Sequence, residues 1–100
     1  MAKISINLKW SLNGGELSPG KYSNKHQIEF NNEIVINGDA APDWNGSKQN
    51  SNPEQALAAA LSSCHMMTFL ALAAKMNWPV SEYTDNAIAI LGKIPKAKCQ

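Results

Sequence analysis

The segment that most constrains this fold is NPEQALAAALSSCHMMTFLALAAK, residues 52–75. At its start, a Ser or Asn cap, a proline in the first turn and Glu54 near the positive helix end are signals that begin a helix. Apolar residues then recur at steps of three and four, and further alanines, leucines and methionines widen the apolar stripe. The segment therefore predicts a helix that runs to about Asn77 and is buried on most of its sides.

The residues before this helix have the two-residue period of β-strands. In residues 3–12, Ile, Leu and Trp alternate with Lys, Ser and Asn, which is typical of a half-buried strand. Residues 22–30 and 33–37 are two more strand-like segments with a polar turn between them. They predict an antiparallel hairpin, which is the shortest way to connect two paired strands.

Two further segments complete the predicted organisation, which is a single domain. Residues 38–52 have loop composition, and Trp44 within them must anchor the loop or face a partner. Residues 81–93 predict a strand after the helix, and residues 94–100 an irregular tail. The fold class is therefore α+β, with N-terminal antiparallel strands, one long buried central helix and a following strand. Little in the chain covers such a helix, so we expect the core to be completed by dimerisation or higher self-association.

Composition argues against several kinds of partner. Nine basic and eight acidic residues give a formal net charge of +1 without any charge run, so we expect no nucleic acid partner. All nine basic residues are lysine, so the bidentate fork of arginine is missing. Polar residues interrupt the apolar run before it reaches the about 20 residues of a membrane span. Without a secretory signal either, the chain is expected to be soluble and cytoplasmic, with no membrane partner.

Cys64 is the residue whose chemistry the pattern leaves open. Cysteine is usually a small buried hydrophobe, whereas a reactive thiol needs a cation, a metal or a helix N-terminus to lower its pKa. Cys64 lies about three turns inside the predicted helix, where the effect of the helix dipole has faded. His65 points about 100° away and does not face the thiol. A reactive Cys64 would therefore need a cation from elsewhere in the protein.

The other polar residues show no pattern that indicates a reaction. No metal-type spacing exists among the histidines and cysteines, so we predict no metal site and no cofactor. The residues considered for zinc are Cys64, His65, His26 and Cys99. The acidic residues outside the helix have no paired-carboxylate signature, and each is expected to be a solvated surface residue. They include Asp39, Asp43, Asp85, Glu29 and Glu82.

The helix segment, residues 52–75, closely resembles the helix of the OsmC/Ohr family, the osmotically inducible and organic hydroperoxide resistance proteins. WSLNGGELSPGKYSNKH near the N-terminus resembles the family's opening strands, and YTDNAIAILGK follows the helix, so the resemblance covers residues 8–93. It implies a thiol-dependent peroxidase with an intertwined α+β homodimer. The family's chain continues through another strand and a second long helix with the resolving cysteine. We therefore expect a shortened relative that resembles the family's N-terminal portion.

The resemblance also implies roles for particular residues. Cys64 matches the peroxidatic cysteine, and Glu54 matches the carboxylate that orients an activating arginine. Relatives carry that arginine where this chain has Asn24, so Lys25 or Lys21 is the candidate to replace its positive charge. Ten residues of helix separate Glu54 from Cys64 by about 15 Å. Either the helix start must bend or a bridging residue must span the two.

Two functional hypotheses follow. In the first, the chain reduces organic hydroperoxides through Cys64 with weak activity, because the arginine and the family's resolving cysteine are missing. Whether Cys99 can act as the resolving thiol is left open. In the second, the chain is a catalytically silent module of the same family that self-associates or binds a ligand or partner. The rate at which an electrophile labels Cys64 at neutral pH distinguishes the two hypotheses.

Overall fold

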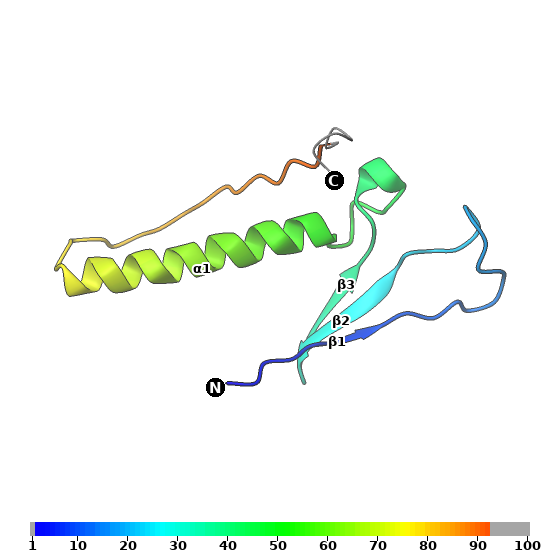
Figure 1. Ribbon diagram of the computed structural model, residues 1–100, viewed down its shortest axis with the longest axis horizontal. Helices are drawn as coiled ribbons and strands as arrows, with labels where there is room; N and C mark the ends of the chain where they lie inside the picture. The colour runs from blue at the N-terminus through cyan, green and yellow to red at the C-terminus, as the bar shows by residue number, and fades with distance from the viewer. Residues whose placement is uncertain (1, 93–100) are drawn as a thin grey trace, which may run out of the picture. The chain divides into compact units, whose positions relative to one another are not determined.

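The computed structural model describes residues 2–92, which form three strands and one long helix (Figure 1). The chain divides into two compact units, Met1–Pro53 and Glu54–Gln100. The first contains the sheet and the second contains nearly all of the helix. The predicted α+β class is confirmed, whereas the single domain stays a prediction. The tail predicted for residues 94–100, with Cys99, lies outside the described residues.

The first unit is built on a small antiparallel sheet in the order β1-β2-β3. Its strands are β1 (Asn7–Lys9), β2 (His26–Asn31) and β3 (Ile34–Gly38). Ile28 of β2 lies opposite Leu8 of β1 and Ile36 of β3, so apolar side chains meet across both strand pairs. The predicted hairpin is confirmed, with residues 32–33 in its turn.

β1 is much shorter than the strand predicted for residues 3–12. Asn7 pairs with Glu29, and β2 then bulges between Glu29 and Asn31 just before the hairpin turn. A bulge interrupts the ladder and bends the strand. The residues before Asn7 therefore have no straight stretch of β2 to pair with, although they have the alternation of a strand.

The loop of residues 38–52 is tied back to the end of β3. The Ser51 N–H donates to the Asn37 carbonyl at 3.0 Å, and the Ser51 carbonyl accepts from the Asp39 N–H at 2.8 Å. Between these ends, Pro42–Trp44 forms the short 3-10 helix η1. The predicted loop is thus closed by backbone hydrogen bonds at its base.

The helix α1 (Pro53–Lys75) has the start and end signals that the sequence predicts. An acidic residue lies in its first turn and a lysine in its last turn, which complements the helix dipole. Asn77 is left-handed with φ of 59°. The Trp78 N–H donates to the Ala73 carbonyl at 2.9 Å, and the Asn77 N–H to the Ala74 carbonyl at 3.2 Å. This is a Schellman end with asparagine in the usual place of glycine, close to the predicted end.

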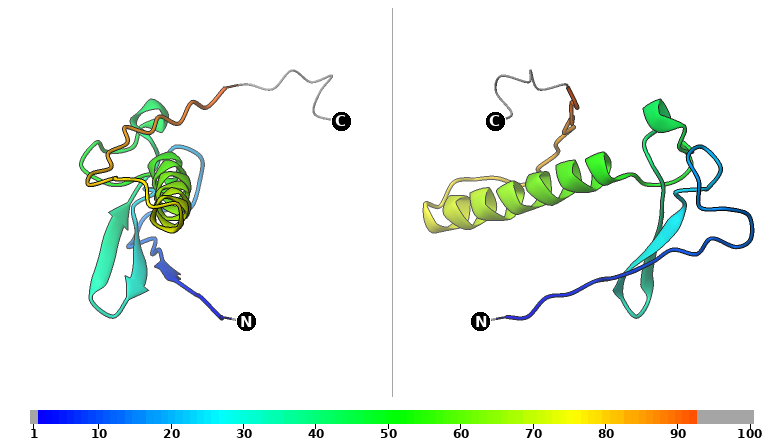
Figure 2. Two further views of the ribbon diagram at one scale, coloured as in Figure 1. Left: turned by 90° about the vertical axis from the view of Figure 1, so that its left-hand side faces the viewer. Right: turned by 45° about the vertical axis from the view of Figure 1, so that its right-hand side comes forward.

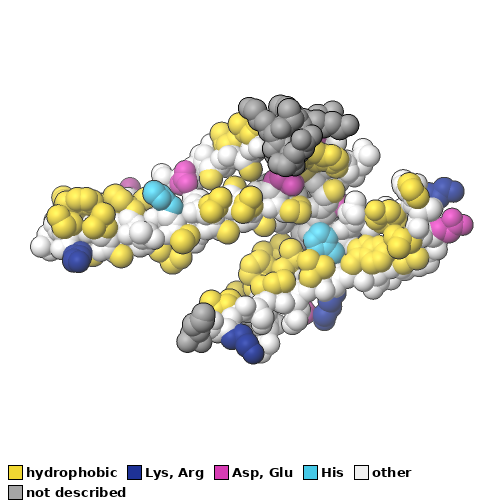
Figure 3. Space-filling model, viewed as in Figure 1, with side chains coloured by type: hydrophobic (Ala, Val, Ile, Leu, Met, Phe, Trp, Pro, Cys, Tyr) yellow, Lys and Arg dark blue, Asp and Glu magenta, His cyan; other side chains and the backbone are white. Residues whose placement is uncertain are grey.

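The predicted burial of the helix is not reached within one chain. Ala73 is the only fully buried side chain that α1 contains. Large apolar side chains along the helix are exposed, and Figure 3 shows apolar surface along α1. The apolar pattern is the predicted one, but residues 76–92 are too few to enclose it. The expectation that a further subunit covers this surface stays a prediction.

By length and composition alone, α1 is also able to cross a membrane. Its apolar run, predicted from the sequence to be too short and too interrupted for a membrane span, is thus long and apolar enough for one. The core helix of a water-soluble protein passes the same test, so the property does not distinguish the two settings. The expected absence of a membrane partner stays a prediction.

Residues 78–92 run back beside α1 as an irregular, extended segment (Figures 1 and 2). The Phe69 ring of α1 contacts the rings of Trp78 and Tyr83, with centroids 6.3 and 5.8 Å apart. The strand predicted for residues 81–93 is wrong over the part that the structure describes. A strand needs a neighbouring strand to pair its N–H and C=O groups, and a helix offers none.

Candidate functional site

Cys64 lies near the middle of α1, and its side chain is exposed. Its carbonyl accepts a hydrogen bond from the Thr68 hydroxyl at 3.1 Å. His65 is exposed as well, and on a helix it points about 100° away from the thiol. The thiol is thus accessible to a small-molecule oxidant rather than packed inside this chain. Accessibility is one condition for redox chemistry at a cysteine.

Cys64 lies on the side of α1 that faces away from residues 78–92. Ser62 and Phe69 make the contacts with that returning segment. At about 100° per residue, Cys64 points in a roughly opposite direction. The side chains around it on this second side are large and exposed. Together they form what we call the thiol face: Leu57, Leu61, Cys64 and Met67.

Glu54 begins the same helix but cannot touch Cys64. Because α1 is continuous from Pro53 to Lys75, the ten residues between the two side chains span about 15 Å along the axis. The bend considered for the helix start is therefore not formed. Lys75 is the only lysine or arginine of residues 54–92, and it lies about 16 Å beyond Cys64. A bridging cation must come from outside this segment if both residues serve one site.

The two candidate lysines lie in the first unit, in the segment before β2. The Lys21 N–H donates to the Ser18 carbonyl at 3.0 Å and closes a turn. The Lys25 N–H donates to Ser23 Oγ at 3.1 Å. Both lysine side chains are exposed, so they are available to an ion-pair partner. Their pairing with Cys64 stays a prediction.

The prediction that Asp39 is a solvated surface residue is wrong. Instead of being solvated, it is 5% exposed and is the only buried charged side chain in residues 2–92. Its carboxylate accepts hydrogen bonds from the N–H of Ser47 at 2.9 Å and of Ala40 at 2.7 Å. The bond from Ser47 does most to lower the pKa of Asp39; burial opposes this, while the Ala40 bond and the charges of Lys25 and His26 lower the pKa further.

A sequence signal for the role of Asp39 did exist. Asp39 directly follows β3 and opens a loop with proline and glycine. In such places an Asp side chain commonly bonds nearby backbone N–H groups and shapes the turn. The sequence did not show that Ser47, eight residues later, would be the hydrogen-bond partner of Asp39, because this bond depends on how the whole loop folds.

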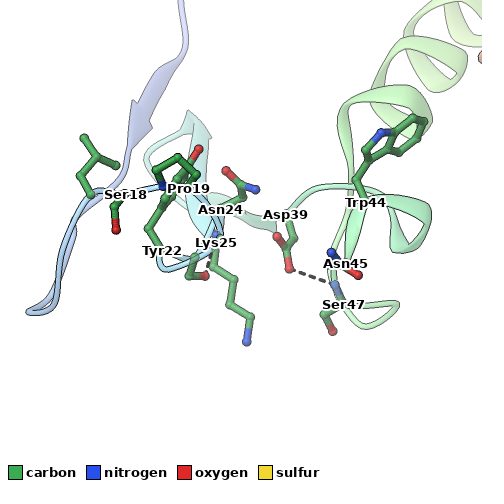
Figure 4. Close-up of a pocket in the computed structure, with 13 residues that line it drawn as sticks. Ser18, Pro19, Tyr22, Asn24, Lys25, Asp39, Trp44, Asn45 and Ser47 are labelled. Carbon is green, nitrogen blue, oxygen red and sulfur yellow. Dashed lines mark hydrogen bonds between the residues drawn. The ribbon is translucent and has the colours of Figure 1, made fainter. Parts of the chain in front are cut away.

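Asp39 lies in the wall of an open hollow of the first unit (Figure 4). In this view the segment with Ser18 and Pro19 lies on one side, the loop with Asn45 and Ser47 on the other, and Lys25 between them. The Ser18 hydroxyl is buried and has no hydrogen-bond partner within the described chain. Of these groups, Lys25 is exposed and available to a small polar molecule. The Asp39 carboxylate is buried and already accepts two hydrogen bonds, and the unpaired Ser18 hydroxyl is buried as well.

No metal centre is formed by the residues that the structure describes, since no three His, Cys, Asp or Glu side chains group together. The His26 Nδ1 lies 2.7 Å from the Asn24 carbonyl, and its ring packs against Gly38. These contacts give His26 a structural role at the start of β2. The prediction that the protein needs no metal or other cofactor stays a prediction.

Comparison with known proteins connects the helix to a family. The family model for OsmC-like proteins matches residues 46–94, which include both Glu54 and Cys64. A solved structure of an OsmC-like protein of unknown function from Vibrio cholerae is 40% identical and superposes with a TM-score of 0.82. The match covers 96% of this chain and 66% of that one. This chain belongs to the OsmC-like family.

The recognition made from the sequence is thereby confirmed, and OsmC-like likeness extends over the sheet as well as the helix. The chain spans 66% of the length of the Vibrio cholerae OsmC-like protein. No protein of curated function matches it. Because the OsmC-like relative is itself of unknown function, the comparisons establish family and fold, and the reaction has to be argued from the site.

Proposed function

We propose that this OsmC-like chain reduces organic hydroperoxides through Cys64, with weak activity. The observation that carries the proposal is an exposed thiol, inside the family match, at the position that resembles the peroxidatic cysteine. Glu54, the matching carboxylate, lies on the same helix. A reducing cytoplasm is the compartment we propose, because it keeps such a thiol free.

The proposed reaction moves one oxygen atom from the peroxide to sulfur. The Cys64 thiolate attacks the distal oxygen of the hydroperoxide, the O–O bond breaks, and the alkoxide leaves and takes up a proton to become an alcohol. Sulfur is oxidised to a sulfenic acid as the peroxide is reduced. A dithiol reductant then forms a mixed disulfide with release of water, and its second thiol restores Cys64. Cys99 is an alternative resolving thiol within the chain.

The thiolate needs a nearby positive charge to be favoured. Residues 54–92 contain Lys75 as their only lysine or arginine, about 16 Å from Cys64 along the helix. We propose that Lys25 or Lys21 supplies the charge, held in place by Glu54. A lysine acts as a point charge without the planar fork of arginine, which is the reason to expect weak activity.

We further propose that the protein is a homodimer or a higher homo-oligomer. Leu57, Leu61 and Met67 of the thiol face are 60%, 64% and 58% exposed in the single chain. Large apolar side chains grouped on one helix face are normally buried against another subunit. A second copy on this face would leave Cys64 at or beside the interface.

The test is stopped-flow consumption of cumene hydroperoxide in the presence of a dithiol. The wild type is expected to consume the peroxide, and Cys64→Ser is expected to lose all activity above background. Ser63→Ala is the matched control, because it changes the neighbouring small side chain and leaves the thiol intact. Equal rates for the wild type and Cys64→Ser would disprove catalysis through Cys64.

A second candidate function is a catalytically silent module that self-associates or binds a ligand. The position of Lys75, far from Cys64 and alone in its segment, favours it. Labelling of Cys64 by iodoacetamide at neutral pH separates the two functions. A rate equal to that of a model thiol, without peroxide consumption, supports the silent module, whereas labelling much faster than a model thiol supports the peroxidase.

A further inference from the structure

We infer that Asn13–Gly14 is a site of spontaneous deamidation, and that the carboxylate formed there shares a hollow with the side chains of Lys9 and Lys25. The chain contains three Asn-Gly pairs: Asn13–Gly14, Asn37–Gly38 and Asn45–Gly46. In such a pair the glycine nitrogen attacks the asparagine side chain, and the missing Cβ of glycine leaves this approach unobstructed. Since the three pairs have the same chemistry, the folded structure decides which of them reacts.

The reaction needs only water. The Gly14 nitrogen forms a bond to the Asn13 side-chain carbon and gives up its proton, and the amide nitrogen leaves as ammonia, so that a five-membered succinimide ring forms. Water then opens the ring at one of its two carbonyls. The products are aspartate and isoaspartate, each with one negative charge more than asparagine and neither requiring an oxidant or a reductant.

Asn13 and Gly14 have the freedom that this ring closure demands. Both are exposed, in irregular backbone with left-handed φ values of 52° and 86°. Within the described residues the Gly14 N–H makes no hydrogen bond. Apart from Gly14 itself and its two chain neighbours, no atom lies within 4 Å of the place where a Cβ on Gly14 would be. The backbone here can rotate to bring the Gly14 nitrogen to the side chain without breaking an existing interaction.

In the other two Asn-Gly pairs, the folded structure restrains the backbone. Asn37 lies in β3 opposite Gln27, and the glycine that follows it is buried. In Asn45–Gly46 the glycine N–H donates to the Ala41 carbonyl at 3.1 Å. Ring closure at either pair requires a strand or a closed loop to open first. Both asparagines should therefore be slow to react until the protein unfolds locally.

The carboxylate produced at residue 13 would not be isolated. Asn13 lines a second hollow of the first unit together with Lys9 and Lys25, and none of the residues that line this hollow is acidic. Lys9 also pairs with Glu29 at 3.4 Å, outside the hollow's lining, whereas Lys25 makes no ion pair within the described residues. A negative charge at this place is attracted by the surrounding positive charges. The modified chain is therefore expected to keep its fold. This inference does not depend on any activity at Cys64.

The test is peptide mapping by mass spectrometry after the full chain is incubated in mildly alkaline buffer. In the folded protein, Asn13 is expected to convert several-fold faster than Asn37 and Asn45, and in denaturant the three rates should converge. Asn13→Gln, which has one more methylene, should block conversion at residue 13 and leave the other two sites unchanged. Equal rates at the three pairs in the folded protein would overturn the inference.

The charge environment is tested with Asn13→Asp, using freshly purified wild type as the uncharged control, because asparagine and aspartate both tolerate the left-handed backbone of residue 13. At low salt the aspartate variant is expected to unfold at the higher temperature, and the difference should shrink as salt screens the attraction. An aspartate variant that unfolds at a lower temperature than the wild type would contradict the placement of residue 13 beside the two lysines.

Discussion

The two units of this chain satisfy different requirements of a folded protein. In the first, strand pairing, the backbone bonds of Ser51 and the buried carboxylate of Asp39 connect residues far apart in the sequence. In the second, α1 pairs the backbone groups of its interior with one another, and Ser62 and Phe69 contact the returning segment, while large apolar side chains such as Leu61 stay exposed. The comparison shows that a helix can pair the backbone groups of its interior and still leave its apolar side chains exposed.

The largest expected effect is loss of association when a charge is placed on the thiol face. Leu61→Asp removes about 1.5–3 kcal/mol of apolar burial per subunit and adds a carboxylate that the interface must desolvate. Sedimentation velocity at micromolar concentration should show the wild type as a dimer or larger and the variant as a monomer. Ala59→Asp, which adds the same charge about 140° around the helix from Cys64, should still associate. A monomeric wild type would contradict the proposed oligomer.

The next largest effect concerns the first unit, where Asp39→Asn should lower stability. The amide keeps one acceptor oxygen, but its NH2 group replaces the oxygen that accepts from the other backbone N–H. Asp43→Asn is the matched control, because Asp43 is exposed in η1. Thermal unfolding should show a larger fall in the unfolding midpoint for Asp39→Asn than for Asp43→Asn. Equal midpoints for the two variants would mean that Asp39 does not hold the loop.

Acid provides a finer test of the same carboxylate. The pKa of Asp39 in the folded protein lies below its ordinary value of 3.8. Its contribution to stability is therefore fully present above that value and is lost as pH falls through the folded pKa. The free energy of unfolding of the wild type, measured against pH, should fall more steeply below about pH 4 than that of Asp39→Asn. Parallel curves in this range would contradict the assignment.

The smallest effect is expected at the contact that holds the returning segment to α1. Ser62→Ala removes the hydrogen bond from the Ser62 hydroxyl to the Asp85 carboxylate, worth about 0.5–1.5 kcal/mol or less at an exposed site. Limited proteolysis within residues 78–92 should become faster, while cleavage within β2 and β3 should not change. Ser63→Ala should leave both unchanged. Faster cleavage in the sheet as well would contradict an effect confined to residues 78–92.

How far the sequence could predict this protein differs between kinds of feature. The helix of residues 53–75 and the hairpin were predicted because their signals are local: a cap, a proline, a period of 3.6 or 2. The strand over residues 81–93 was predicted from the same kind of local signal and is wrong up to residue 92. A strand depends on a neighbour that its own sequence does not contain.

By itself the sequence determined the helix, the hairpin and the resemblance that led to the OsmC-like family, since each depends on residues close together in the chain. Only the tertiary structure decided that Asp39 is buried and that Cys64 lies on an exposed face of α1. It also decided that the Gly46 N–H is hydrogen-bonded, whereas that of Gly14 has no partner among the described residues. The physical reason is the same in each case. Burial and hydrogen bonding depend on which distant residues become neighbours, and this is settled only when the chain folds.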